Sequence, residues 1–157
     1  MARATWYRLD NIGKFYSSQA GSAAQTVFRY AATLADDVDP VLLQRALEKT
    51  VDVFPGFNVC LRSGMFWHYL EQATTVPAVT REVLPICFGL HVDAKSVLFR
   101  VSYHQARINF EVSHMVSDGR GALNFFKALL YAYLQERHGV LDVPAEYDGS
   151  DHQKTEN

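Results

Sequence analysis

Residues 107–133 read RINFEVSHMVSDGRGALNFFKALLYAY, and two different periodicities meet inside this stretch. Over residues 107–113 apolar and polar side chains alternate, which is typical of a β-strand with one face in a core. After residue 119 apolar residues recur at helical spacing and form a broad stripe: Ala122, Leu123, Phe125, Phe126, Leu129, Leu130 and Tyr133. The change of period predicts a strand that ends near Ser113, a short loop, and a helix that begins near Gly119.

The residues upstream of this stretch predict the elements that accompany it. Residues 96–103 also alternate, and a short turn around His104-Gln105 joins them to residues 107–113 as a β-hairpin. Two aromatic-rich runs, residues 57–62 and 65–71, flank a Ser63-Gly64 turn and predict an earlier hairpin. Residues 72–95, interrupted by Pro77 and Pro85, are predicted to be irregular.

A first strand and a first helix precede these hairpins. Residues 26–34 are compatible with a strand, and Asp39-Pro40 then predicts a helix start, because Asp caps free N–H groups and Pro suits the first helical position. Pro55-Gly56 ends that helix. The order of strand, helix, hairpin, hairpin and helix predicts an α/β (α+β) two-layer sandwich, in which helices cover a mixed, mostly antiparallel sheet.

The chain has 157 residues, enough for one ordinary domain. We expect residues 1–145 to form that domain and the polar residues 146–157 to form a tail or a linker. The net charge is −2 and no basic run is present, which argues against a nucleic-acid partner. No signal peptide and no apolar stretch of membrane-spanning length is seen, so a cytoplasmic protein is expected. Cys60 and Cys87 lie among apolar residues and are expected to be buried, reduced thiols.

The loop between the predicted strand and helix carries the residues with the clearest chemical potential. His114 lies at the end of the strand, and histidine is the side chain best suited to move a proton near neutral pH. Asp118 precedes the helix, where the free N–H groups and the helix dipole favour a carboxylate. Gly119 and Gly121 allow a sharp turn and a close approach of the backbone.

Less specific interpretations of the same residues remain open. His114 could be a structural residue that closes a strand, and Asp118 could serve only as a helix cap. His114 and Asp118 are too few for a catalytic zinc, so no metal site is predicted. A serine hydrolase is disfavoured, because no Gly-x-Ser-x-Gly elbow is present and the side chains of Ser113 and His114 should point to opposite faces. Surface or packing roles are expected for His68, His91 and His104. Trp67 and Tyr69 could line a pocket, but alternating aromatic residues on a hairpin are expected to pack across the strands.

The pattern His114-x-x-x-Asp118-Gly119 after a strand and before a helix resembles the signature of the chloramphenicol-acetyltransferase-like superfamily. That superfamily includes the condensation domains of nonribosomal peptide synthetases. The resemblance covers most of residues 5–145 and is strongest for the N-terminal half of bacterial alcohol-acetyltransferase-type proteins. It also rests on several other segments: Tyr7-Arg8-Leu9-Asp10-Asn11, residues 39–47 (DPVLLQRAL), 53–57 (VFPGF), 60–62 (CLR) and 64–70 (GMFWHYL). Many relatives have a second His before the catalytic one, and Ser113 stands at that position here.

The resemblance implies a CoA-dependent acyltransferase, more narrowly an O-acetyltransferase, of which this chain is the N-terminal subdomain. His114 would be the general base that takes a proton from an alcohol or amine acceptor as the acceptor attacks an acyl thioester. Asp118 would be structural and would pair with an arginine, for which the candidates are Arg8, Arg62 and Arg100. Ser113 or Ser117 could help to position the intermediate. Acetyl-CoA or another acyl-CoA would be a co-substrate, with an acyl-carrier protein as the alternative donor, and no tightly bound cofactor is expected.

Relatives of this superfamily place the histidine in a channel between two similar subdomains. The chain would therefore be inactive alone, either as a truncated form of a longer enzyme or as a natural half that a second copy completes. A non-catalytic binding or oligomerisation module that kept the fold is the alternative from a different functional class.

Overall fold

A computed structural model describes residues 6–7, 27–88, 90 and 96–139. Their strands and helices follow in this order: β1 (Trp6–Tyr7), β2 (Val27–Thr33), α2 (Pro40–Val53), η1 (Pro55–Phe57), β3 (Val59–Ser63), β4 (His68–Gln72), β5 (Thr80–Arg81), β6 (Phe99–His104), β7 (Arg107–Ser113) and α3 (Gly119–His138). The predicted boundary between residues 145 and 146 lies outside the described residues.

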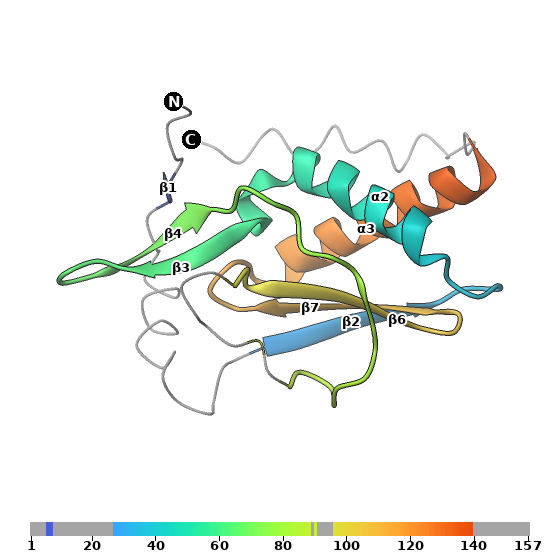
Figure 1. Ribbon diagram of the computed structural model, residues 1–157, viewed down its shortest axis with the longest axis horizontal. Coiled ribbons are helices and arrows are strands. Elements are labelled where there is room, and N and C mark those ends of the chain that lie inside the picture. The colour runs from blue at the N-terminus through green and yellow to red at the C-terminus, as the bar shows by residue number, and fades with distance from the viewer. Residues whose placement is uncertain (1–5, 8–26, 89, 91–95, 140–157) are drawn as a thin grey trace.

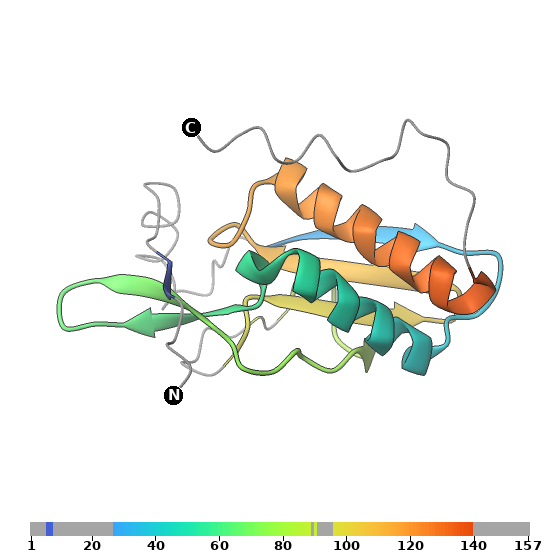
Figure 2. The same cartoon turned by 90° about the horizontal axis from the view of Figure 1, so that it is seen from above.

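The described strands form two sheets. The larger has the order β2-β7-β6-β5, in which β7 is antiparallel to both β2 and β6 and the short β5 is parallel to β6. The smaller has the order β1-β4-β3 and is antiparallel. Helices α2 and α3 lie side by side on one face of the larger sheet, while the β3–β4 hairpin extends away from it (Figures 1 and 2). The predicted α/β two-layer sandwich with a mixed, mostly antiparallel sheet is confirmed.

Local sequence signals determine where α2 begins and where α3 ends. The Asp39 carboxylate accepts from the backbone N–H groups of Val41 and Leu42, and Pro40 occupies the first turn of α2. Helix α3 ends where Gly139 takes a φ of 80°, a conformation that glycine adopts at little cost, and its N–H donates to Gln135 O at 2.8 Å. Each of these caps satisfies backbone groups that the helix itself leaves without a partner.

The main core lies between the two helices and the larger sheet. The face of β7 toward the helices carries the predicted alternating residues, which are fully buried: Ile108, Phe110 and Val112. Phe110 stacks against Phe125 of α3 with ring centroids 4.9 Å apart, at an interplanar angle of 22°. Packing of this kind supplies most of the stability of amphipathic elements, because each such residue removes apolar surface from water.

Some predictions for individual residues need correction. A short strand occurs at Thr80–Arg81, inside a stretch predicted to be irregular. Another occurs at Trp6–Tyr7, upstream of the first predicted strand. Cys60 is buried as expected, but Cys87 is only half-buried, and no disulfide joins the two cysteines. Trp67 was expected to pack across the hairpin; it lies in the hairpin's turn instead, and 63% of its surface is exposed.

None of the helices in the described part of the chain is long and apolar enough to cross a membrane.

Candidate functional site

The candidate site is the loop that connects β7 to α3. Strand β7 ends at Ser113, whose N–H donates to Leu98 O at 2.9 Å. The chain then turns at residues 114–116, where Val116 N–H donates to Ser113 O at 3.0 Å and Met115 N–H donates to Ser113 Oγ at 3.2 Å. His114 is thus displayed on a hydrogen-bonded turn at a strand end, where a rigid scaffold positions it.

The His114 ring lies against β2. Its centroid is 4.3 Å from that of Phe28, with 41° between the ring planes, and the side chain is half-buried. Ser113, by contrast, is 4% exposed, and its hydroxyl is engaged by Met115 N–H. A half-buried imidazole packed against an aromatic ring is oriented and still accessible, which is what a proton-transfer residue needs.

Asp118 caps α3. Its carboxylate accepts from Gly121 N–H at 2.7 Å, and its backbone carbonyl accepts from Ala122 N–H at 3.0 Å. The side chain is exposed. The carboxylate therefore secures the start of the helix that follows the His114 turn.

The arginines proposed as partners of Asp118 bind other carboxylates. Arg62 pairs with Glu71 on the neighbouring strand, and Arg100 pairs with Glu111. The third candidate, Arg8, lies outside the described residues. Within the described residues, the capping interaction rather than an ion pair therefore holds Asp118.

The two glycines of the motif lie in crowded surroundings. A Cβ at Gly121 would fall well inside the van der Waals contact distance of Ser117 Oγ and 3.3 Å from Asp118 Oδ1. A Cβ at Gly119 would lie 3.4 Å from the hydroxyl oxygen of Tyr30, and that hydroxyl donates to Gly119 O at 2.8 Å. Gly121 thus leaves room for Ser117, whose hydroxyl donates to Asp118 O at 3.1 Å.

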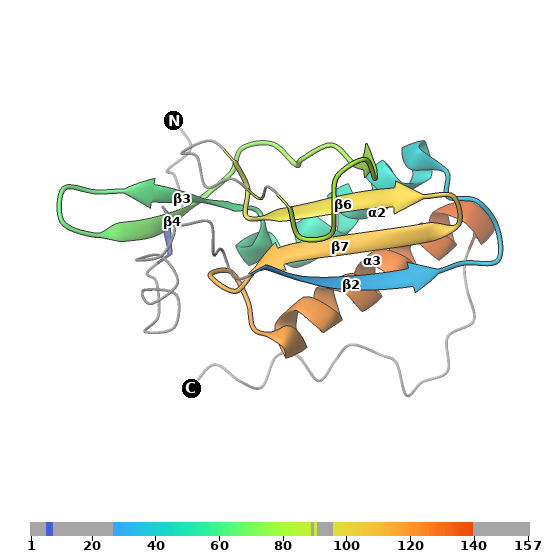
Figure 3. The ribbon, with the colours of Figure 1, turned by 90° about the horizontal axis from the view of Figure 1, so that it is seen from below.

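Sequence reasoning missed a cluster of charged residues on the sheet face opposite the helices. Glu111, only 1% exposed, binds Arg29 of β2 at 2.8 Å and Arg100 of β6. Arg29 also binds Glu82 at 2.6 Å, and Glu82 in turn binds Arg107. The segment between β4 and β6, which contains Glu82, crosses this face (Figure 3). In the sheet Arg29 and Arg100 are both register partners of Glu111, a relation that the order of residues along the chain does not reveal.

The cluster shifts the pKa of both carboxyl groups. Burial by itself would raise the pKa of Glu111, but the N–H of Cys87, 2.7 Å away, and the guanidinium groups of Arg100 and Arg29 outweigh it and lower that pKa. Glu82 behaves likewise: burial opposes the ionised form, yet the hydrogen bonds from Arg107 and Arg29 lower its pKa. Both groups are therefore held ionised in the folded protein.

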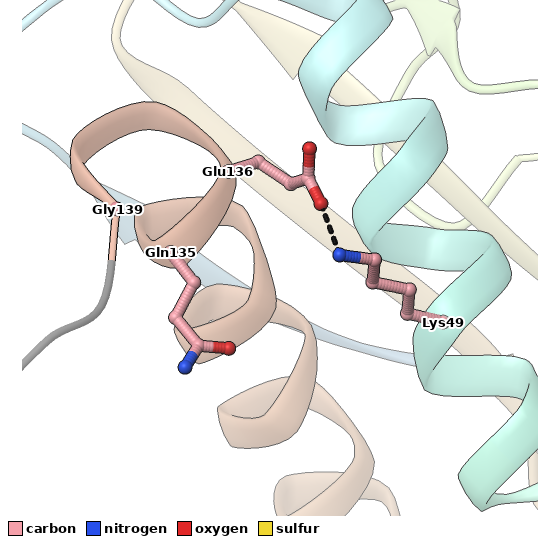
Figure 4. Close-up of a pocket in the computed structure, with 4 residues that line it drawn as sticks. All are labelled: Lys49, Gln135, Glu136 and Gly139. Carbon is pink, nitrogen blue, oxygen red and sulfur yellow. Dashed lines mark hydrogen bonds and ion pairs between the residues drawn. The ribbon is translucent and has the colours of Figure 1, made fainter.

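A surface pocket lies far from the candidate site. It is lined by Lys49, Gln135, Glu136 and Gly139, and Lys49 forms an ion pair with Glu136 across it (Figure 4). The pocket is at the C-terminal end of α3, and the 20 residues of that helix place it about 30 Å from the His114 turn. Across the described part of the chain, His, Cys, Asp and Glu side chains form no group of three or more that could hold a metal ion.

No protein-family model matches this sequence, and no curated protein matches it significantly. Solved structures do match. The starter condensation domain of rhizomide synthetase aligns with a TM-score of 0.68 at 14% identity, over 92% of this chain and 40% of that one. The fold is that of the N-terminal subdomain of a condensation domain.

Other structures agree on the fold. The X-domain from teicoplanin biosynthesis aligns with a TM-score of 0.68 at 15% identity, over 92% of this chain and 36% of that one. The polyketide synthase associated protein 5 of Mycobacterium tuberculosis aligns with a TM-score of 0.60 at 16% identity, over 86% of this chain and 34% of that one. The chain therefore spans less than half the length of these neighbours. The resemblance to the condensation-domain superfamily is supported at the level of fold.

Proposed function

We propose that this chain supplies the general-base half of an acyltransferase, with His114 as the base. The observation that carries the proposal is the position of His114. It is half-buried against Phe28 at the end of β7, on a turn held by Ser113 and followed at once by the capped helix α3. The fold shared with condensation domains supports the same assignment.

In the proposed reaction His114 accepts the proton of an acceptor hydroxyl or amine. The acceptor oxygen or nitrogen forms a bond to the thioester carbonyl carbon, and the tetrahedral intermediate then breaks its carbon–sulfur bond. The departing thiolate takes the proton back from the imidazolium, so the products are an ester or amide and a free thiol. A positioned general base of this kind contributes about 10²–10⁴-fold to such a step.

An acyl-CoA is the proposed donor. A variant of the rhizomide synthetase starter condensation domain, which aligns with a TM-score of 0.70 at 13% identity, was solved in complex with C8-CoA. The first condensation domain of the calcium-dependent antibiotic synthetase was solved with a substrate analogue. An acyl-carrier protein is the alternative donor. Transfer of an acetyl group to an alcohol is the finer form of the proposal and rests on the resemblance of the sequence to alcohol acetyltransferases.

A second subdomain is proposed to complete the active site, because the chain spans about 40% of the rhizomide synthetase domain. It could come from a longer form of this chain or from a second copy. Within the chain itself, Asp118 and Gly121 would maintain the backbone that joins His114 to α3.

The experiment measures thiol release from a panel of acyl-CoAs with simple alcohols and amines, using this chain and any longer chain that its gene encodes. His114→Ala is compared with His104→Ala, a matched control because His104 is exposed at the end of β6. The proposal expects acceptor-dependent release that His114→Ala loses and His104→Ala keeps. Release that survives in His114→Ala contradicts the role of His114. If no acyl-CoA gives acceptor-dependent thiol release, acyl-carrier thioesters are tested next. Absence of release with both kinds of donor contradicts the proposed acyltransferase activity.

One observation favours a binding or oligomerisation role as the second candidate. The turn of the β3–β4 hairpin presents three consecutive apolar residues, and Met65, Phe66 and Trp67 are 86%, 86% and 63% exposed. Large exposed apolar groups of this kind mark surfaces that bind other molecules. Sedimentation of Phe66→Ser over a range of concentrations tests this role, and self-association equal to that of the unmodified chain counts against it.

A further inference from the structure

The turn that carries His114 lies between two apolar clusters. On one side the His114 ring packs against Phe28, a residue that itself packs against the main core. On the other side the next residue, Met115, is 7% exposed and belongs to a separate cluster. Consecutive side chains of the turn thus contact two parts of the molecule that are built from different elements.

The second cluster is formed largely by the base of the β3–β4 hairpin. Its buried members are Val59, Leu61, Leu70, Leu98 and Met115, and Val116 packs against it. We name it the hairpin cluster. Leu61 and Leu70 are register partners in the hairpin, so one comes from each strand. The hairpin cluster therefore joins the turn after β7 to a hairpin more than 40 residues earlier in the chain.

Backbone contacts connect the same regions. Cys60 of β3 forms an isolated antiparallel bridge with Val97, and Leu98 O accepts from Ser113 N–H at 2.9 Å. Backbone contacts therefore connect the hairpin to the two residues before β6, and connect those residues to the end of β7. A displacement of the hairpin base would be transmitted to the residue before His114.

We propose that Met115, with Leu61 and Leu70 of the hairpin, positions the His114 imidazole. The proposal rests on the proposed function in that His114 is the base, but the geometry can be tested without any turnover. Met115 is held by the hairpin cluster, and because it follows His114 directly, its position limits the backbone conformations of the turn. That limit keeps the imidazole against Phe28. These are positioning residues and not catalytic ones.

The test uses NMR of the full chain, with the His114 ring signal assigned from its loss in His114→Gln. The perturbing variants are Leu70→Ala and Met115→Ala, which leave a cavity in the hairpin cluster. Leu43→Ala is the matched control: it makes the same kind of cavity in the main core, where Leu43 is fully buried near the start of α2, a helix that contributes no residue to the hairpin cluster. Met115→Leu nearly conserves volume and serves as the rescue variant.

The expected result is that both hairpin-cluster variants move the His114 ring signal toward that of an unstructured histidine and weaken its proton contacts with the Phe28 ring. Leu43→Ala should lower stability but leave both readouts in place, and Met115→Leu should restore them. If Leu70→Ala does not fold, Leu70→Val is measured in the same way. An unchanged His114 signal in the folded variants overturns the proposal, as does an equal displacement in Leu43→Ala. If the hairpin-cluster variants displace His114 but the chain has no acyltransferase activity, the positioning proposal is supported. Only the proposed function is then contradicted.

Discussion

The crowding around Gly121 leads to a prediction whose sign depends on a second residue. A methyl group at Gly121 would collide with Ser117 Oγ, but it would lie 3.7 Å from Ser117 Cβ, which is ordinary contact. Gly121→Ala should therefore be unfavourable or neutral in the native chain. In a Ser117→Ala background the colliding oxygen is gone, and the same substitution should stabilise the protein.

The magnitude follows from two opposing contributions. Alanine in a helix is favoured over glycine by about 0.5–1 kcal/mol, because glycine loses more backbone freedom on folding. Against this, Ser117 Oγ must move away and give up its hydrogen bond to Asp118 O, which costs about 0.5–1.5 kcal/mol. The contact with Asp118 Oδ1 at 3.3 Å is common to both backgrounds. The coupling between the two sites should thus be roughly 1 kcal/mol.

Urea denaturation followed by circular dichroism measures the free energy of unfolding for the native chain, the two single variants and the double variant. Gly119→Ala in both backgrounds is the control, since among the described residues a Cβ at Gly119 meets only Tyr30 Oη, at 3.4 Å. Its effect should be independent of residue 117. If Gly121→Ala changes stability equally with Ser117 and with alanine at that position, then Ser117 Oγ does not limit the site and the reasoning is wrong.

Further predictions concern charge, capping and the hairpin. Glu111→Gln should destabilise the fold by about 3–5 kcal/mol, because it removes the buried carboxylate charge that both Arg29 and Arg100 bind; chemical denaturation checks this. The pKa of Glu111 and the pKa of Glu82 are lower in the folded protein than in the unfolded chain. Ionisation of these two carboxyl groups therefore stabilises the fold at pH values above the ordinary carboxyl pKa of about 4.3. Thermal stability should fall as pH drops below that value, and a Glu111→Gln profile of equal steepness would contradict the assignment. Asp118→Ala should cost about 1 kcal/mol in urea unfolding while Asp118→Asn keeps most of the cap. Phe66→Ser should change stability by less than about 0.5 kcal/mol, since the side chain is 86% exposed.

The elements set by local signals could be predicted from the sequence. Asp39-Pro40 marks the start of α2, and the alternation over residues 107–113 coincides with β7. The start of α3 follows in the same way from Asp118 and the glycine after it. In each case the deciding signal, a cap or an alternation, lies within a few neighbouring positions, so the order of residues along the chain contains the information.

The cluster of charged residues on the sheet face opposite the helices could not be predicted, for the opposite reason. Alternation correctly assigned Glu111 to the face away from Phe110, but such a face is expected to meet water. It is buried because Arg29 and Arg100 align with Glu111 across neighbouring strands and because the segment with Glu82 crosses it. Strand register and the path of a long connection depend on residues far apart in the chain. The spacing of residues within one strand therefore does not predict them.

The same distinction bears on how far the motif alone can identify function. His114, Asp118 and Gly121 specify a turn and a capped helix, and any chain with that local pattern can build both. The orientation of the imidazole depends in addition on Phe28 and on the hairpin cluster around Met115. A chain that kept the motif but lost the apolar residues of the hairpin cluster would keep the turn, but its His114 imidazole would no longer be held against Phe28. The contacts on either side of His114 are therefore a more selective criterion for the proposed chemistry than the motif itself.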